Sequence, residues 1–170
     1  MNTAELLADA FGRIQKTVHG AVEGLTPDEI AEQIEPGANS VAWLLWHLAR
    51  VQDDHVADVA GRDQVWTTEG WEKRFGLPFE AAATGFGHGS EQVAEVRVPD
   101  PALLTGYYDA VHEATLDYVR GLSDEDLDRV VDTRWDPPVT LGVRLVSVID
   151  DDIQHAGQAA FVHGVLLRRR

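Results

Sequence analysis

The sequence predicts an all-α protein, a four-helix bundle with short accessory helices and a long linker between the second and third long helices. Four long segments carry apolar residues three or four positions apart, which is the period of a helix buried along one face. The ends of these segments carry residues that suit helix caps, and strand-like alternation is confined to residues 93–98. With 170 residues, 44% of them hydrophobic, the chain is expected to form a single domain over residues 1–170.

The first long helix is predicted over residues 4–23, ending near Gly24. Its buried face is expected to consist of Leu7, Phe11, Ile14, Val18 and Val22. The following residues, Thr26 to Glu29, form a capping-box pattern with proline at the first helical position. They predict a short helix that reaches as far as Pro36-Gly37.

The second long helix is predicted over residues 41–60, capped by Ser40 and ended by Gly61. From residue 62 to residue 100 the periodicity breaks, and glycines alternate with scattered aromatic residues. This stretch is expected to be a partly ordered linker with short helical turns. Linkers of this length in small domains often carry function, so it is expected to lie over a site.

The third long helix is predicted over residues 101–120, with Gly121 at its end. Its apolar stripe comprises Leu104, Tyr107, Val111, Ala114 and Tyr118. A short acidic turn follows at residues 123–126, and Asp136-Pro137-Pro138 forms a rigid break. Thr140 is then expected to cap a fourth long helix that extends to about Leu167.

The composition excludes several classes of function. Lys and Arg number 14 against 29 Asp and Glu, a net charge of −15, which argues against nucleic-acid partners and anionic membrane surfaces. The chain has no cysteine, which excludes disulfides, thiolate metal sites and a cysteine nucleophile. No signal peptide and no apolar stretch of membrane-spanning length are visible. A cytoplasmic protein is expected.

Two predicted helices carry residues that suit a metal site. His47 lies in the middle of the apolar run of the second long helix, while Asp151 and His155 are one turn apart on the predicted core-facing stripe of the fourth. A divalent cation would offset the cost of burying the carboxylate. Three oxygen and nitrogen ligands suit an open site for zinc, nickel, iron, cobalt or manganese. The alternative is a solvated aspartate run at residues 150–152 and a lone interior histidine.

Three further residues are candidates for supporting roles. Asp54 follows His47 on the same helix face and is expected either to orient a ligand imidazole or to lie in solvent. His88 lies in the long linker and is expected either to contact substrate or to be an ordinary loop histidine. Arg144 is expected to form a salt bridge with an acidic neighbour, the alternative being an anionic substrate. His55 is expected at the surface.

The segments 39–48 (NSVAWLLWHL) and 151–159 (DDIQHAGQA) resemble the DinB/YfiT-like superfamily of metalloenzymes. That family carries a histidine on the second helix and an HxxxH pattern on the fourth, followed closely by Gly-Gln or Gly-His. In this chain Asp151 replaces the first histidine of HxxxH. An acidic residue at this position is typical of an actinobacterial branch that includes mycothiol-dependent enzymes. The resemblance covers essentially the whole chain.

The resemblance implies a DinB-like bundle that holds one divalent metal through His47, Asp151 and His155. It further implies a low-molecular-weight thiol cosubstrate such as mycothiol, and S-transfer to, or thiol-assisted isomerisation of, an electrophilic substrate. Two alternatives stay open, a metal-dependent hydrolase and a non-catalytic, stress-related or binding bundle with a degenerate site. A homodimer is expected because apolar bundle faces often pair.

Overall fold

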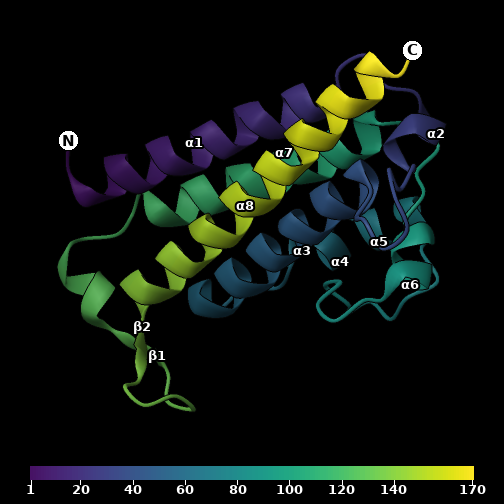
Figure 1. The fold of residues 1–170 in the computed structure, drawn as a ribbon. Coiled ribbons are helices and arrows are strands. Elements are labelled where there is room, and N and C mark those ends of the chain that lie inside the picture. The colour runs from purple at the N-terminus through teal and green to yellow at the C-terminus, as the bar shows by residue number, and fades with distance from the viewer.

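The computed structural model describes all residues from 1 to 170, and it confirms the all-α four-helix bundle (Figure 1). The long helices are α1 (Thr3–Val22), α3 (Val41–Ala60), α7 (Ala102–Val119) and α8 (Leu141–Arg168). The short elements are α2 (Pro27–Ile30), α4 (Val65–Thr68), α5 (Trp71–Phe75), α6 (Ser90–Ala94), a 3-10 helix η1 (Glu125–Asp128) and the strands β1 (Val130–Asp132) and β2 (Val139–Thr140). No helix is both long enough and apolar enough to cross a membrane.

The four long helices form a closed ring around one core. α8 packs against α1 and α3, and α7 packs against the same two helices from the opposite side, as Figure 1 shows with α8 in front and α7 behind. α1 and α3 are therefore diagonal partners, and so are α7 and α8. Since α8 touches two neighbours at once, side chains on two adjacent stripes of α8 are covered.

The predicted caps and stripes of the first half are largely present. The side chain of Ser40 accepts a hydrogen bond from the Trp43 backbone N–H at 3.1 Å, and Gly61 ends α3 at φ 65°. In α1, Ala21 and not Val22 completes the buried stripe, so the buried face differs from the predicted one at its C-terminal end. α2 is shorter than expected, although its capping box at Thr26 has formed.

The linker over residues 62–100 holds α4, α5 and α6 and packs Trp66, Trp71 and Phe75 inward, whereas Phe86 is exposed. Its alternating run at residues 93–98 forms no strand, because Val93 and Ala94 belong to α6 and the residues after them are irregular. The strands of the structure lie elsewhere, in an antiparallel hairpin that pairs Val130 with Thr140 and Asp132 with Val139. They are too short for alternation to show in the sequence.

The prediction that Asp151 and His155 lie in the middle of the core-facing stripe of α8 is wrong by one position. Asp152 and Ala156 occupy that stripe and are buried, whereas Asp151 and His155 are half-buried and turn toward α3. The side chain of Asp152 has no hydrogen-bond partner for either oxygen. Burial and the nearby charge of Asp151 raise the pKa of Asp152 well above its ordinary value.

Candidate metal centre

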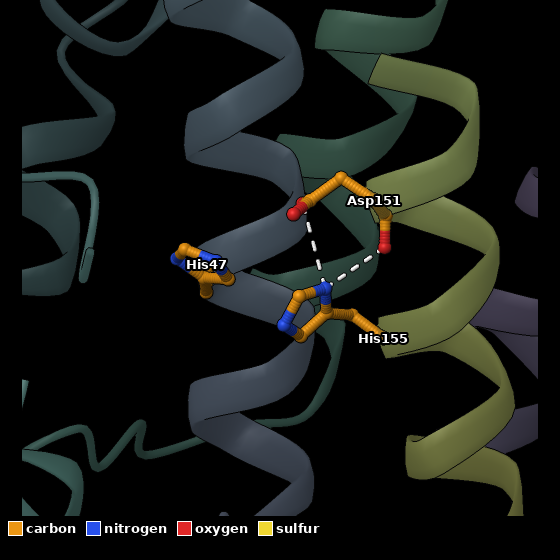
Figure 2. A group of neighbouring side chains, drawn as sticks. All are labelled: His47, Asp151 and His155. Carbon is orange, nitrogen blue, oxygen red and sulfur yellow. Dashed lines mark hydrogen bonds and ion pairs between the residues drawn. The ribbon is translucent and has the colours of Figure 1, made fainter. Parts of the chain in front are cut away.

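Three potential ligands meet where α3 packs against α8 (Figure 2). His47 comes from the buried side of α3, and Asp151 and His155 come from successive turns of α8. One ligand atom from each residue lies within 4.8 Å of the other two. The rings of His47 and His155 lie 4.7 Å apart between centroids and are steeply inclined, at 68°. The structure thus brings together the three residues that the sequence predicted as ligands.

His47 is held in a single orientation with one nitrogen free. Its Nδ1 lies 2.6 Å from the backbone oxygen of Thr84, so Nδ1 donates and Nε2 carries the unshared lone pair. The Trp43 ring stacks on the imidazole at 4.6 Å and an angle of 11°. Burial lowers the pKa of His47, which keeps the ring neutral. A backbone carbonyl at the second nitrogen is the usual support of a metal-ligating histidine.

The linker segment that carries Thr84 is fixed by a buried arginine. Arg50 donates from Nε to the Ala83 oxygen at 3.1 Å and from Nη2 to the Ala81 oxygen at 3.2 Å. Its charge lies 3.7 Å from the carboxylate of Asp53, and both side chains are fully buried. Arg50 therefore positions the carbonyl that orients His47, although it touches no ligand itself.

Gly85 lets this segment approach the ligand closely. It adopts φ +91°, a conformation that favours glycine. A Cβ at this position would lie 2.9 Å from Nδ1 of His47 and 2.9 Å from the ring of Trp46. The linker consequently covers the candidate site, as its length and composition predicted.

Asp151 and His155 form a polarised pair on α8. Nδ1 of His155 lies 2.8 Å from the backbone oxygen of Asp151 and 3.4 Å from its Oδ2. The hydrogen bond from His155 to Asp151 raises the pKa of His155. Burial acts to raise the pKa of Asp151, but the hydrogen bond and the charges of His155 and His47 outweigh it, so the pKa is lowered.

The donor set fits a divalent cation. Oδ2 of Asp151 is buried and incompletely satisfied, because the neighbouring Nδ1 of His155, at 3.4 Å, lies closer to the Asp151 backbone oxygen, at 2.8 Å; an anionic oxygen in this position is costly. Beside it stand the free Nε2 of His47 and the ring of His155, whose Nδ1 faces its own helix. Two imidazoles and one carboxylate are ligands that zinc and other first-row metals accept. His47, Asp151 and His155 could therefore hold such an ion.

Two of the three residues, His47 and Asp151, line a cavity of about 480 Å³. Its lining consists of His47, Val51, Asp54, His55, Thr84, Phe86, Ser147 and Asp151. A second cavity, of about 450 Å³, shares Asp54 with the first and extends along α3 to Gln64. Together the two cavities have room for a small molecule next to His47 and Asp151.

The other predicted residues take different places. Asp54 lines both cavities and accepts a hydrogen bond from Gln64 at 2.7 Å. It does not orient His47, because the Thr84 carbonyl takes that role. Nδ1 of His88 accepts a hydrogen bond at 3.2 Å from Nε1 of Trp43, the residue whose ring stacks on His47. Arg144 forms the expected salt bridge, with Asp132 at 3.1 Å.

His55, which the sequence predicted at the surface, has a side chain that is 38% exposed, and it lines the cavity together with His47, a position that the sequence did not predict. Sequence reasoning also missed Arg50 and the Thr84 carbonyl. The glycines around residue 85 were the available signal, since a conformation restricted to glycine often marks a close approach.

The fold and the site define a helical bundle with a His/His/Asp group between its second and last long helices, a common arrangement for a metal site in a bundle. A family model of the DinB superfamily matches residues 10–159. The crystal structure of a conserved protein from Enterococcus faecalis superposes with a TM-score of 0.92, at 31% identity and 98% coverage of both chains. Among curated proteins none matches. The chain belongs to the DinB superfamily, which confirms the resemblance inferred from its motifs.

Proposed function

We propose that the protein is a metal-dependent enzyme of thiol chemistry. It would carry out S-transfer from a low-molecular-weight thiol such as mycothiol, or a thiol-assisted isomerisation of an electrophilic substrate. The observation that carries this proposal is that His47, Asp151 and His155 lie within 4.8 Å of one another, beside a cavity that His47 and Asp151 line. The cofactor would be a divalent ion of zinc, nickel, iron, cobalt or manganese.

A divalent metal favours a thiolate over a thiol and so supplies a nucleophile at neutral pH. Asp151 contributes a negative charge, and His47 contributes a neutral imidazole fixed by Thr84. Val51 and Phe86 line the cavity with apolar surface. Because the chain contains no cysteine, the reacting sulfur must come from a second molecule. The adjoining cavity that shares Asp54 has room for part of it.

The test is thiol consumption by zinc-loaded protein with mycothiol and 1-chloro-2,4-dinitrobenzene as the electrophile. Turnover should require both metal and thiol, and His47→Ala should abolish it. His163→Ala is the matched control, because this partly exposed histidine bonds the Glu23 carbonyl away from the site. Hydrolysis of ester substrates without thiol would favour the metal-dependent hydrolase. Absence of both turnover and metal binding would favour the non-catalytic bundle.

We also propose that the protein acts in the cytoplasm, without nucleic-acid or membrane partners, and pairs as a homodimer. Its net charge of −15 supports the absence of polyanionic partners. Exposed apolar side chains on α8 support the dimer, namely Val143, Val146, Ile153 and Phe161. Light scattering should give the mass of a dimer for the wild type and of a monomer for Ile153→Asp. A monomeric wild type would contradict the dimer.

A further inference from the structure

We propose that His55 is a hydrogen-bond donor to the substrate, held by Arg144 in the tautomer that carries its proton on Nε2. The inference rests on the proposed function and adds a residue and a substrate feature to it. The feature is an oxygen that carries or gains negative charge, such as that of a carbonyl or carboxylate group.

His55 belongs to the same cavity as the candidate ligands. It follows His47 by about two turns of α3, and both residues line the cavity together with Asp151. The imidazole is partly accessible, with 38% of the side chain exposed. A molecule bound beside the three potential ligands would therefore lie within reach of His55.

The contact with Arg144 sets the tautomer of His55. Nη1 of Arg144 lies 3.3 Å from Nδ1 of His55. A guanidinium group only donates hydrogen bonds, so Nδ1 must accept, and the proton of the neutral ring then lies on Nε2. Burial and the charge of Arg144 lower the pKa of His55, consistent with a neutral ring. Since Nδ1 is occupied, Nε2 is the nitrogen left for the cavity.

The acidic neighbours do not reverse this arrangement. Oδ2 of Asp54 lies 4.0 Å from Nδ1 of His55, which is beyond hydrogen-bond distance. The other oxygen of Asp54 accepts from Gln64 at 2.7 Å. Asp58 and Asp151 act on His55 only through their more distant charges. Arg144 is thus the hydrogen-bonding partner of Nδ1.

The β hairpin keeps Arg144 in place. Nη2 of Arg144 donates to Oδ2 of Asp132 at 3.1 Å, and the Asp132 side chain is only 5% exposed. Asp132 belongs to β1 and also binds Arg134 at 2.8 Å. A carboxylate at Nδ1 would make the histidine a base at Nε2, as in a catalytic triad. A guanidinium at Nδ1 makes it a donor at Nε2, suited to stabilise negative charge on a substrate oxygen.

The tautomer can be measured by nitrogen-15 NMR of the histidine rings in the metal-free protein. The wild type should show His55 protonated at Nε2 and unprotonated at Nδ1. Arg144→Met should give a mixture of tautomers, whereas Arg134→Met, which removes the exposed partner of Asp132, should leave His55 unchanged. A proton on Nδ1 in the wild type, or an unchanged tautomer in a folded Arg144→Met protein, would overturn the role of Arg144.

The donor role can be measured with acetohydroxamate, an anionic oxygen ligand, titrated into zinc-loaded protein. His55→Phe should weaken its binding about tenfold, the effect of one lost hydrogen bond to a charged group. His55→Gln keeps an N–H donor and should recover much of the affinity. Wild-type affinity in His55→Phe would overturn the donor role. Failure of the wild type to bind zinc would refute the proposed function and the donor role with it, while the NMR result would still decide the tautomer.

Discussion

Gly85 is the position where a single methyl group should disturb the candidate site most selectively. Gly85→Ala places a Cβ 2.9 Å from Nδ1 of His47 and 2.9 Å from the Trp46 ring, on a backbone with φ +91°. Nδ1 of His47 is also the atom that donates to the Thr84 carbonyl at 2.6 Å. The added methyl must therefore separate the linker from the histidine that it orients.

Two contributions set the size of the effect. The left-handed backbone costs about 1–2 kcal/mol for a residue with a Cβ. The overlap with His47 and Trp46 adds about 1–3 kcal/mol, the usual cost of overpacking. Loss of the hydrogen bond between His47 and Thr84 should weaken metal binding about 10–100-fold, as for other groups that support a ligand.

Gly87→Ala is the matched control, because Gly87 has φ +79° and a Cβ there meets nothing within 4 Å. Both variants pay the backbone cost, so the difference between them isolates the overlap at Gly85. Urea unfolding should show a larger loss of stability for Gly85→Ala, and calorimetry should show weakened zinc binding for this variant alone. Equal stability and equal zinc affinity in the two variants would refute this account of the linker.

Three further predictions concern buried charge. Arg50→Met leaves the carboxylate of Asp53 buried without its charged partner, so the free energy of unfolding in urea should fall by about 3–5 kcal/mol. A fall of less than about 1 kcal/mol would contradict the role of Arg50 as the partner of this buried carboxylate. The pKa of Asp152 is raised, so its contribution to the stability of the metal-free protein should be lost as pH rises above about 4, where the unfolded chain releases this proton and the folded chain keeps it. The stability of the wild type relative to Asp152→Asn should therefore fall with rising pH in urea unfolding. Parallel stability curves for the two proteins would contradict burial of the proton. Asp151 raises the pKa of His155, and zinc must displace the proton of the protonated ring before it binds. The zinc affinity measured by calorimetry should therefore increase as pH rises through this pKa and then level off. A zinc affinity independent of pH between about 5 and 8 would contradict His155 as a ligand.

The helices and the potential ligands could be predicted because their signals are local. A period of three or four residues marks the buried faces of the long helices, and the spacing of Asp151 and His155 places them on one face of any helix. The sequence could not decide which of two adjacent positions of α8 faces the core, because α8 packs against both α1 and α3 and two of its stripes are covered. Asp152 and not Asp151 is consequently the fully buried aspartate of α8.

The support of the site could not be predicted because it depends on contacts that leave no local pattern. The partner of His47 is the Thr84 backbone oxygen, a group that every residue possesses. Arg50 has no feature in the sequence that separates it from the other arginines; only the fold shows that it binds the linker. The link from Asp132 to Arg144 depends on a hairpin whose strands are too short to be recognised.

The central claim is that His47, Asp151 and His155 bind a divalent metal, and the metal content of the purified protein tests it most directly. Mass spectrometry should find about one ion per chain in the wild type. Asp150→Ala, a change at the exposed neighbouring aspartate, should retain the ion, whereas Asp151→Ala should lose it. A wild type that stays free of metal after incubation with zinc, or an Asp151→Ala protein that keeps its ion, would contradict the account.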